Sequence, residues 1–367
     1  MSEKVILAAV FKPKEKEVSS YKLSELESLV KTAGATITSE VIQFREKIDP
    51  DYCLGKGKLA ELKEKIVQNS VNTVIFGVDL SPKQTRNLEE FLKVKVIDRT
   101  ELIMDIFAKH AKTKESKLQV ELAQLLYRLT KLKGMGKWLS RLGGGIGTRG
   151  PGEKMLEIKK RNILLRIKHL KEKLKEIEKQ RDVQSKKRKN FFKVCLIGYT
   201  NVGKTSLLNL ITREKAETKD ALFVTLDALT RKFYIDGIPI ILSDTVGFIE
   251  DIPVSLIHSF KSTLKVILDA DLLLHVVDVS NPMKEKQIES VNKVLSEIGV
   301  HDKDIIYVFN KYDLFFEEEE KLYLKNKYKP AVFVSAKFGD NIDLLIENIK
   351  LYALKYISEK QYGGTIN

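Results

Sequence analysis

The stretch KVCLIGYTNVGKTSLLNLI, residues 193–211, sets the architecture of the second half of the chain. It has the pattern of a buried strand, a glycine-containing loop and a helix. Four residues separate Gly198 from Gly203, and Lys204 and Thr205 follow at once, which is the P-loop pattern in the context that it requires. Glycines let backbone N–H groups converge on a β-phosphate, and the helix N-terminus adds the positive end of its dipole. The stretch therefore predicts a nucleotide-binding α/β domain.

The loop and a second motif, DTVG, are expected to surround the phosphates. Lys204 would neutralise charge on the β- and γ-phosphates, and the Thr205 hydroxyl would bind Mg²⁺. Asp244 ends the apolar run IPIILSD and would hold Mg²⁺ through water, while Gly247 would offer its N–H to the γ-phosphate. The predicted phosphate-binding residues are Gly198, Tyr199, Thr200, Asn201, Val202, Gly203, Lys204, Thr205, Asp244, Thr245, Val246 and Gly247.

Two further motifs indicate which base is bound. In IIYVFNKYD, residues 305–313, Asp313 can accept hydrogen bonds from N1–H and the 2-amino group of guanine, and adenine offers neither, so adenine should be rejected. The motifs follow predicted strands in the order that a GTP-hydrolysing domain needs, at the strand ends where open α/β sheets bind ligands. The predicted base-binding residues are Asn310, Lys311, Tyr312, Asp313, Ser335, Ala336 and Lys337.

Length and charge favour a second functional half. The chain has 367 residues, which suggests two or three domains, and a formal net charge of +14. Residues 1–190 contain 42 Lys and Arg against 25 Asp and Glu, a net charge of +17, whereas residues 191–367 have a net charge of −3. A one-sided excess favours a polyanionic partner such as nucleic acid over an ordinary solvated surface.

Other bulk features predict a cytoplasmic protein. Cys53 and Cys195 are the only cysteines, and neither has a CxxC partner, so disulfide and zinc frameworks are not expected. The first residues lack the pattern of a secretory signal. The longest apolar runs are too short to span a bilayer.

Residues 1–100 alternate short β-like runs with amphipathic helices, which predicts a small parallel sheet covered by helices. Strands are expected at 5–11, 36–44, 73–78 and 94–98. Helices are expected near 20–33, with Ser19 or Ser20 as the cap, and near 57–68 and 81–93.

From Glu101 the pattern is helical, and a long helix over about 153–181 carries apolar residues at coiled-coil spacing. We expect it to pair with the helix near 116–132 as an antiparallel hairpin within one chain. Between them, residues 134–152 hold eight glycines and a proline and are expected to form a loop. The predicted organisation is an α/β subdomain (1–100), the hairpin (101–183), a linker (184–190), a GTPase domain with a mostly parallel six-stranded sheet and helices on both faces (191–357), and a tail (358–367).

Several strings together indicate a family. LGKGKLAEL (54–62), SPKQTRNLEE (81–90) and GGGIGTRGPGE (143–153), with GYTNVGKT, FVTLD and DTVGF, resemble the HflX family of ribosome-associated GTPases. The resemblance covers about residues 5–340. Some members have a further C-terminal domain, and we expect this chain to be the form that lacks it.

The resemblance implies a role for the segment ALFVTLDALTRKF, residues 221–233, as switch I. Thr225 or Thr230 would complete the Mg²⁺ shell; the FVTLD pattern favours Thr225, and Thr230 starts the next strand. The expected nucleotide contacts in this segment are Phe223, Val224, Thr225, Leu226 and Asp227. The predicted catalytic residues are Lys204, Thr225 and Gly247, with Thr205 and Thr225 as the magnesium ligands.

The resemblance also implies that the protein acts on the large (50S) ribosomal subunit. We expect it to bind GTP and GDP and to be a monomer. The expected roles are ribosome splitting or recycling, translation or ribosome biogenesis. The expected rRNA contacts are Lys56, Lys58, Arg141 and Arg149. A second interpretation is nucleotide-dependent, helicase-like remodelling of RNA by the basic half, and a third is a passive module. Binding of a second nucleotide such as ATP by the first half also stays open.

Two residues raise questions of mechanism. Phe248 stands where many such enzymes have a glutamine that orients the attacking water, so the free protein is expected to be slow and to depend on the ribosome. Asn201 either shapes the P-loop or helps to hold K⁺ beside the phosphates, where a cation would stabilise transition-state charge.

Overall fold

The computed structural model describes residues 2–142, 151–186, 191–213, 222–223, 229–250, 256 and 261–363. Side chains are not described at 133–142, 151–155, 181–186, 261–263 and 361–363. The chain forms two compact units, and the division falls within one long helix, between Glu176 and Ile177.

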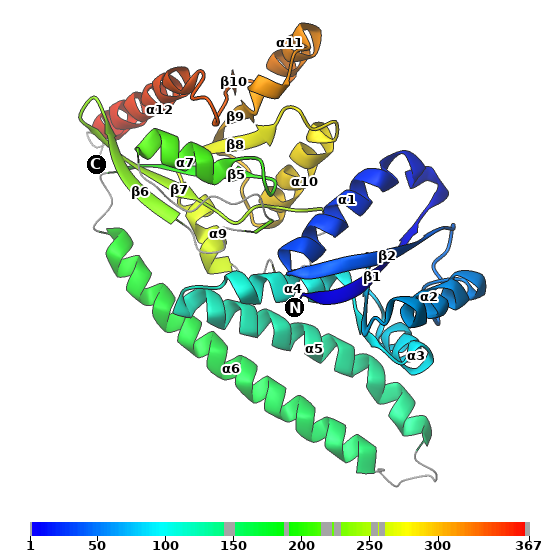
Figure 1. Ribbon diagram of the computed structural model, residues 1–367. Coiled ribbons are helices and arrows are strands. Elements are labelled where there is room, and N and C mark those ends of the chain that lie inside the picture. Colours follow the sequence, from blue (N-terminus) through cyan, green and yellow to red (C-terminus); the bar gives the residue numbers. More distant parts are fainter. Residues whose placement is uncertain are drawn as a thin grey trace. The chain divides into compact units, whose positions relative to one another are not determined.

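The first unit contains a four-stranded parallel sheet in the order β2-β1-β3-β4. Its strands β1 and β2 lie side by side in Figure 1. β1 pairs with both β2 and β3, so its residues from Val5 to Ala9 are almost fully buried. The elements are β1 (Glu3–Phe11), η1 (Pro13–Glu15), α1 (Lys16–Thr32), β2 (Ala35–Phe44), α2 (Lys56–Asn69), β3 (Thr73–Phe76), α3 (Pro82–Leu92), β4 (Lys95–Ile97) and α4 (Arg99–His110). The predicted small parallel sheet is confirmed.

Local sequence explains where the helices of this unit begin. Ser81 caps α3 in a capping box, because the Gln84 backbone N–H donates to the Ser81 hydroxyl at 3.2 Å and the Ser81 N–H donates to the Gln84 side chain at 2.9 Å. Pro82 at the first helical position is preset for the helix. The prediction for α1 was wrong: the helix begins at Lys16 after Glu15, and neither Ser19 nor Ser20 caps it.

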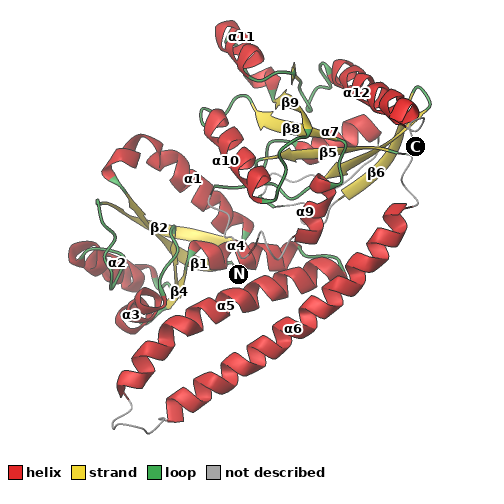
Figure 2. Ribbon diagram, turned by 180° about the vertical axis from the view of Figure 1, so that it is seen from behind, coloured by secondary structure: helices red, strands yellow, loops and turns green. Residues whose placement is uncertain are grey.

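Helices α5 (Lys114–Leu142) and α6 (Pro151–Lys186) form the predicted hairpin and run side by side in Figures 1 and 2. Leu122 of α5 packs with Ile167 and Leu170 of α6, and all three are buried. Arg166 adds a bidentate ion pair to Glu121 across the two helices, with N–O distances of 2.7 and 3.0 Å. The two helices therefore pair within one chain.

Two boundaries differ from the sequence-based prediction. Residues 134–142 continue α5 and residues 151–152 begin α6, although a loop was expected over 134–152. An interior glycine costs a helix only about 1 kcal/mol, so isolated glycines such as Gly134 and Gly136 do not end it. Residues 184–186 of the predicted linker also belong to α6, because no proline or glycine interrupts the helix there.

The second unit contains a six-stranded sheet in the order β10-β9-β8-β5-β7-β6, in which only the β6–β7 pair is antiparallel among the described strands. Helices lie on both of its faces (Figures 1 and 2). Its elements are β5 (Phe192–Gly198), α7 (Lys204–Thr212), β6 (Leu229–Ile235), β7 (Ile238–Asp244), α9 (Lys261–Leu268), β8 (Leu272–Asp278), α10 (Lys284–Glu297), β9 (Asp304–Asn310), η2 (Tyr312–Leu314), α11 (Glu318–Lys327), β10 (Ala331–Phe333) and α12 (Ile342–Gly363).

This sheet is the predicted one, and α12 extends beyond the prediction. Residues 358–363 were expected to form part of a tail, but they are helical. No proline occurs there and the first glycine is Gly363, so nothing in the local sequence stops the helix earlier.

The packing of the hairpin gives a first prediction. Leu170→Ala should lower the free energy of unfolding of the first unit by about 2–5 kcal/mol, because Leu170 is fully buried in the seam and the substitution leaves a cavity. Leu165→Ala is the matched control on the same helix, since Leu165 is 60% exposed, and it should change stability by no more than about 0.5 kcal/mol. Urea titration followed by circular dichroism measures both; equal effects would contradict the packing of the hairpin.

Candidate nucleotide-binding site

Two positions of the P-loop can hold only glycine, because neighbouring atoms occupy the space that a side chain would need. Gly198 has φ +147°, and a Cβ there would lie 2.2 Å from the carbonyl oxygen of Val276. Gly203 has φ +92°, and a Cβ there would lie 2.3 Å from the side-chain nitrogen of Asn310. No other residue fits either position, so the loop follows β5 closely and enters α7 directly at Lys204.

Lys204 lies inside the loop with 7% of its surface exposed. Its ammonium group donates to the carbonyl oxygens of Gly198 and Tyr199 at 3.1 and 2.6 Å. Burial lowers the pKa of Lys204 to about 8, and the nearby Asp244 carboxylate partly opposes this shift. A phosphate in contact with the ammonium would favour the charged form and restore the pKa.

An oxygen pair suited to Mg²⁺ lies beside Lys204. The Thr205 hydroxyl donates to Oδ2 of Asp244 at 2.6 Å, and Asp244 is fully buried at the end of β7. Hydroxyl and carboxylate oxygens are the ligands that hard cations prefer. Thr245 has a structural role, because its hydroxyl donates to the Leu196 carbonyl at 2.8 Å within the core.

Switch I is only partly described. Phe223 is buried, with a positive φ of +57°. Val224, Thr225, Leu226 and Asp227 lie outside the described residues, so the predicted magnesium role of Thr225 stays a prediction. Thr230 lies in β6 and its hydroxyl is 3.1 Å from that of Ser243, in agreement with a structural role.

Asn310 joins the phosphate end of the site to the base end. Its amide nitrogen donates to the Val202 carbonyl of the P-loop at 2.7 Å, and its amide oxygen accepts from the Ala336 backbone N–H at 2.9 Å. The Ser335 hydroxyl donates to Asp313 at 2.6 Å and so fixes the carboxylate that was predicted to recognise guanine. Three segments far apart in sequence therefore meet where the predictions place them.

The other residues predicted to bind the base, Tyr312, Lys337 and Lys311, contact other side chains of the protein. Tyr312 accepts a hydrogen bond from Lys321 at 2.6 Å, and Lys337 is exposed, with its ammonium 5.0 Å from the centre of the Phe338 ring. Lys311 forms an ion pair with Asp278 at 2.6 Å. Asp278 was not predicted from the sequence, although its place at the carboxyl end of a buried strand was a usable signal.

The DTVG segment pairs with the P-loop through its backbone. Thr200 N–H donates to the Phe248 carbonyl at 2.7 Å, and Phe248 N–H donates to the Gly198 carbonyl at 3.1 Å. The hydroxyl of Tyr199 accepts from Glu250 N–H at 2.7 Å. We call residues 247–250 and these three bonds the switch II clasp; the sequence did not predict it.

Gly247 packs tightly inside this clasp. A Cβ at Gly247 would lie 2.8 Å from Cα of Thr200 and 3.0 Å from the ammonium nitrogen of Lys204. The Phe248 side chain is 3% exposed and belongs to the core, so it does not face a reacting water. The clasp thus holds Gly247 beside the lysine that was predicted to bind the γ-phosphate.

Asn201 is exposed and has φ +61°, in the left-handed region that asparagine tolerates. This conformation agrees with the loop-shaping interpretation. The cation-binding interpretation stays a hypothesis.

The predicted rRNA contacts lie in the first half. Lys56 is exposed at the start of α2, and Lys58 forms an ion pair with Glu61 at 2.7 Å. The backbone of Arg141 belongs to α5, and Arg149 lies outside the described residues. The four residues therefore stay predictions.

Comparison with known proteins follows the same division of the chain. Residues 20–108 match a family described as GTP-binding GTPase N-terminal, and residues 110–188 match its middle region. Residues 193–311 match a family described as 50S ribosome-binding GTPase. GTPase HflX of Caldanaerobacter subterraneus subsp. tengcongensis is 45% identical over 95% of this chain and 80% of that protein.

The chain belongs to the HflX family of GTPases. GTPase HflX of Escherichia coli is 40% identical over 94% of this chain and 82% of its own length. The crystal structure of SsGBP in complex with GDP is similar, with a TM-score of 0.54 and 27% identity over 97% of this chain and 99% of that chain. This HflX-family protein is a GTP hydrolase, and the family resemblance in its sequence is confirmed.

Among the described residues, no helix combines the length and the hydrophobicity that crossing a bilayer requires.

The Asp313 geometry predicts a change of base preference. Asp313→Asn should weaken GTP binding by roughly 10²–10⁴-fold, because the acceptor loses its charge and the amide NH2 then faces the 2-amino group of guanine, donor against donor. Xanthosine triphosphate should bind this variant better than GTP, since xanthine offers a carbonyl where guanine has the 2-amino group. Asp343→Asn, at an exposed position in α12, is the control. Titration calorimetry with both nucleotides decides; an unchanged preference for GTP would rule out this role for Asp313.

The low pKa of Lys204 predicts proton uptake on GTP binding. In the free protein Lys204 loses its proton as pH rises through about 8, and the bound phosphates restore that proton. Binding should therefore take up close to one proton at about pH 9 and about a quarter of a proton at about pH 7.5, with affinity falling as pH rises. Calorimetry in two buffers of different ionisation enthalpy measures the uptake. The same uptake at both pH values would contradict the assignment.

Proposed function

We propose that this protein is a guanine-nucleotide switch that binds the large ribosomal subunit through rRNA. The switch II clasp carries the proposal, because its hydrogen bonds join the P-loop to the residues beside Gly247, next to the lysine that would bind the γ-phosphate. Two further observations support it. The second-half family is described as 50S ribosome-binding, and the positive charge of the chain is concentrated in residues 1–190.

The P-loop would bind the triphosphate through backbone N–H groups and the Lys204 ammonium. Thr205 would hold Mg²⁺ directly and Asp244 would hold it through water, and their oxygens 2.6 Å apart fit such a cation. A Mg²⁺ ion held by these residues would supply positive charge that offsets the negative charge of the phosphates. Thr225 would complete the cation site. Lys311, Asp313 and the Ser335 loop would enclose guanine.

Gly247 packs against Lys204 and Thr200, so a γ-phosphate beside Lys204 would shift the clasp until the Gly247 N–H donates to that phosphate. GTP would therefore hold the clasp in a second position, and GDP, which lacks the γ-phosphate, would leave it in the first. Each backbone bond of the clasp contributes about 1 kcal/mol, so phosphate contacts of ordinary strength are sufficient to displace it. This gives a switch with two positions close in free energy.

Phe248 cannot hold the attacking water, because its side chain belongs to the core. The free enzyme would be slow, with the ribosome ordering switch I and switch II and so positioning the water. The same coupling would let the nucleotide state control ribosome splitting or recycling, translation or ribosome biogenesis in the cytoplasm, with the protein acting as a monomer. The alternative is RNA remodelling by the basic half, which the charge of residues 1–190 also favours.

The ribosome dependence predicts a large change in GTP turnover. Adding 50S subunits should accelerate hydrolysis by up to about 10⁵-fold, the range that partner proteins achieve in related switches. Small subunits at equal concentration are the control, and phosphate release is the measurement. No acceleration by 50S subunits would contradict the proposal.

Comparing KCl with NaCl tests the Asn201 hypothesis, which requires a faster rate in KCl.

Nucleotide-gated binding distinguishes a switch from a passive module. Sedimentation with 50S subunits should be stronger with a non-hydrolysable GTP analogue than with GDP, and it should weaken steeply as salt rises, because Lys and Arg displace counterions from rRNA. Binding that ignores the nucleotide would leave only the passive module. Strand separation by the protein, driven by nucleotide in the absence of ribosomes, would favour the remodelling interpretation.

A further inference from the structure

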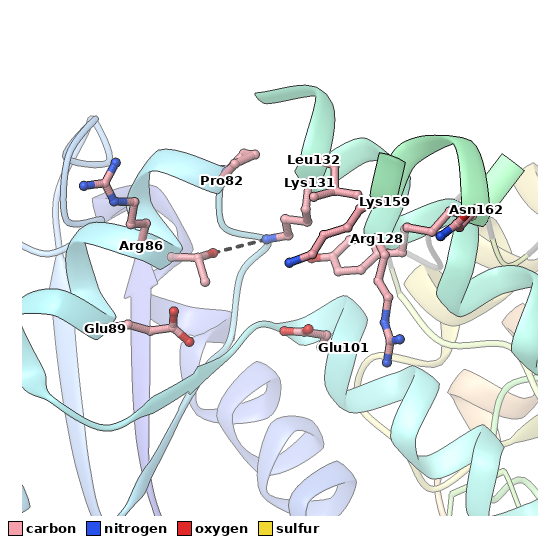
Figure 3. Close-up of a pocket in the computed structure, with 12 residues that line it drawn as sticks. Pro82, Arg86, Glu89, Glu101, Arg128, Lys131, Leu132, Lys159 and Asn162 are labelled. Carbon is pink, nitrogen blue, oxygen red and sulfur yellow. Dashed lines mark hydrogen bonds between the residues drawn. The ribbon is translucent and has the colours of Figure 1, made fainter. Parts of the chain in front are cut away.

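The first unit contains a cavity of about 550 Å³ that the GTP site does not include (Figure 3). Residues of α3, α4, α5 and α6 line it, all of them from Pro82 to Ile163 in the sequence. Its volume lies in the range of pockets that bind small molecules. Four helices converge on it, so the backbone that carries its lining residues belongs to packed helices.

One wall of the cavity is fixed by a buried carboxylate. Asp98 is 1% exposed, caps α4, and accepts hydrogen bonds from the Tyr127 hydroxyl and from the Lys131 ammonium, the latter at 2.7 Å. Lys131 also donates to the Leu80 carbonyl at 2.6 Å and to the Thr85 hydroxyl at 3.3 Å. The three donors of Lys131 are therefore used within the protein, and this lysine is part of that wall.

Five other charged side chains line the cavity; Arg86 of α3 is paired with Glu90 at 2.6 Å, and four remain available. Glu89 of α3, Glu101 of α4, Arg128 of α5 and Lys159 of α6 line it, and within the described residues these side chains form no hydrogen bond or ion pair. Figure 3 shows the Glu89 and Glu101 carboxylates and the Lys159 ammonium directed toward the same space. Of these four side chains, the two acids lie on α3 and α4, and the two bases lie on α5 and α6 of the hairpin.

Arg86 and Lys131 are paired with Glu90 and Asp98, and the remaining four charges sum to zero, although residues 1–190 as a whole carry +17. A site built for a polyanion such as RNA would present an excess of positive charge. Glu101 in addition is partly withdrawn from water, and burial followed by repulsion from Asp98 raises its pKa. A cationic group beside it would relieve this cost. Apolar surface from Pro82, Leu132 and Ile163 completes the lining.

We propose that this cavity binds a small zwitterion with an apolar body, of the class of an apolar amino acid or dipeptide. Its ammonium group lies against Glu89 and Glu101, and its carboxylate lies against Lys159 and Arg128. The apolar body contacts Leu132 and Ile163. Charged groups leave water without a large cost only when each finds a partner, so both ends of the ligand are recognised.

Three matched probes test the charge requirement on the full-length protein. Leucyl-leucine has both charges, its N-acetyl derivative lacks the ammonium, and its amide lacks the carboxylate. In saturation-transfer NMR, leucyl-leucine should give the strongest signal, and each blocked probe should bind about tenfold more weakly or worse, because a charged contact is lost. Equal signals from all three probes, or no signal from leucyl-leucine, would overturn the proposal.

Two charge-neutral variants locate the ends of the ligand. Glu101→Gln should weaken the binding of leucyl-leucine and of its amide, which both carry the ammonium, and should leave the binding of the N-acetyl probe unchanged. Lys159→Gln should weaken the binding of leucyl-leucine and of the N-acetyl probe, which both carry the carboxylate, and should leave the binding of the amide unchanged. Glu64→Gln on α2 and Lys175→Gln on α6 are exposed matched controls that should change nothing. Glu89→Gln, also at an exposed site, repeats the first test where Glu101→Gln disturbs folding. The GTPase rate without ribosomes should be the same in all variants, so a failure here leaves the switch proposal untouched. Binding that none of the charge variants alters would refute the site.

Discussion

The nucleotide site depends on how closely the P-loop approaches its neighbours. Gly198 lies against the Val276 carbonyl and Gly203 against the Asn310 amide, so a side-chain carbon at either position would displace a strand end. This close approach lets one amide, that of Asn310, bond to the P-loop and to the loop after β10 at once. The loop predicted to bind the phosphates and the loop predicted to bind the base are thereby fixed relative to one another by a buried hydrogen-bonded group that is costly to break.

In the first unit, the buried carboxylate of Asp98 joins neighbouring elements, as the Asn310 amide does in the second unit. Its carboxylate caps α4 and binds Tyr127 and Lys131 of α5, so the helical hairpin is tied to the end of β4. A buried carboxylate that lost these partners would be strongly unfavourable, which favours one arrangement of α4 and α5 over others. Most of the hairpin, by contrast, is held by apolar side chains such as Leu122 and Leu170 in a coiled-coil seam.

The two kinds of contact around the P-loop differ in strength. Asn310 and the glycines bind the loop to the sheet through buried groups, whereas the clasp adds three hydrogen bonds between backbone or hydroxyl groups. Rigid and easily reversed contacts thus lie side by side on one loop. Such an arrangement suits a protein whose binding site has to persist while one adjoining segment moves. The burial of Phe248 anchors residues 247–250 to the core.

Both sheets, the hairpin, the P-loop and the family could be predicted from the residues alone, since these depend on short-range periodicity, on glycines at required positions and on motif order. The strand ends that carry Asn310, Asp313 and Ser335 could also be predicted, because parallel strands end at one edge. Prediction failed where helix and irregular structure have similar local free energy. These places are Gly134 and Gly136 inside α5 and the helical ends at 184–186 and 358–363. The clasp, the Lys311–Asp278 pair and the charge-balanced cavity became visible only in the folded molecule. Each of these joins residues whose proximity depends on chain packing, and no local pattern records it.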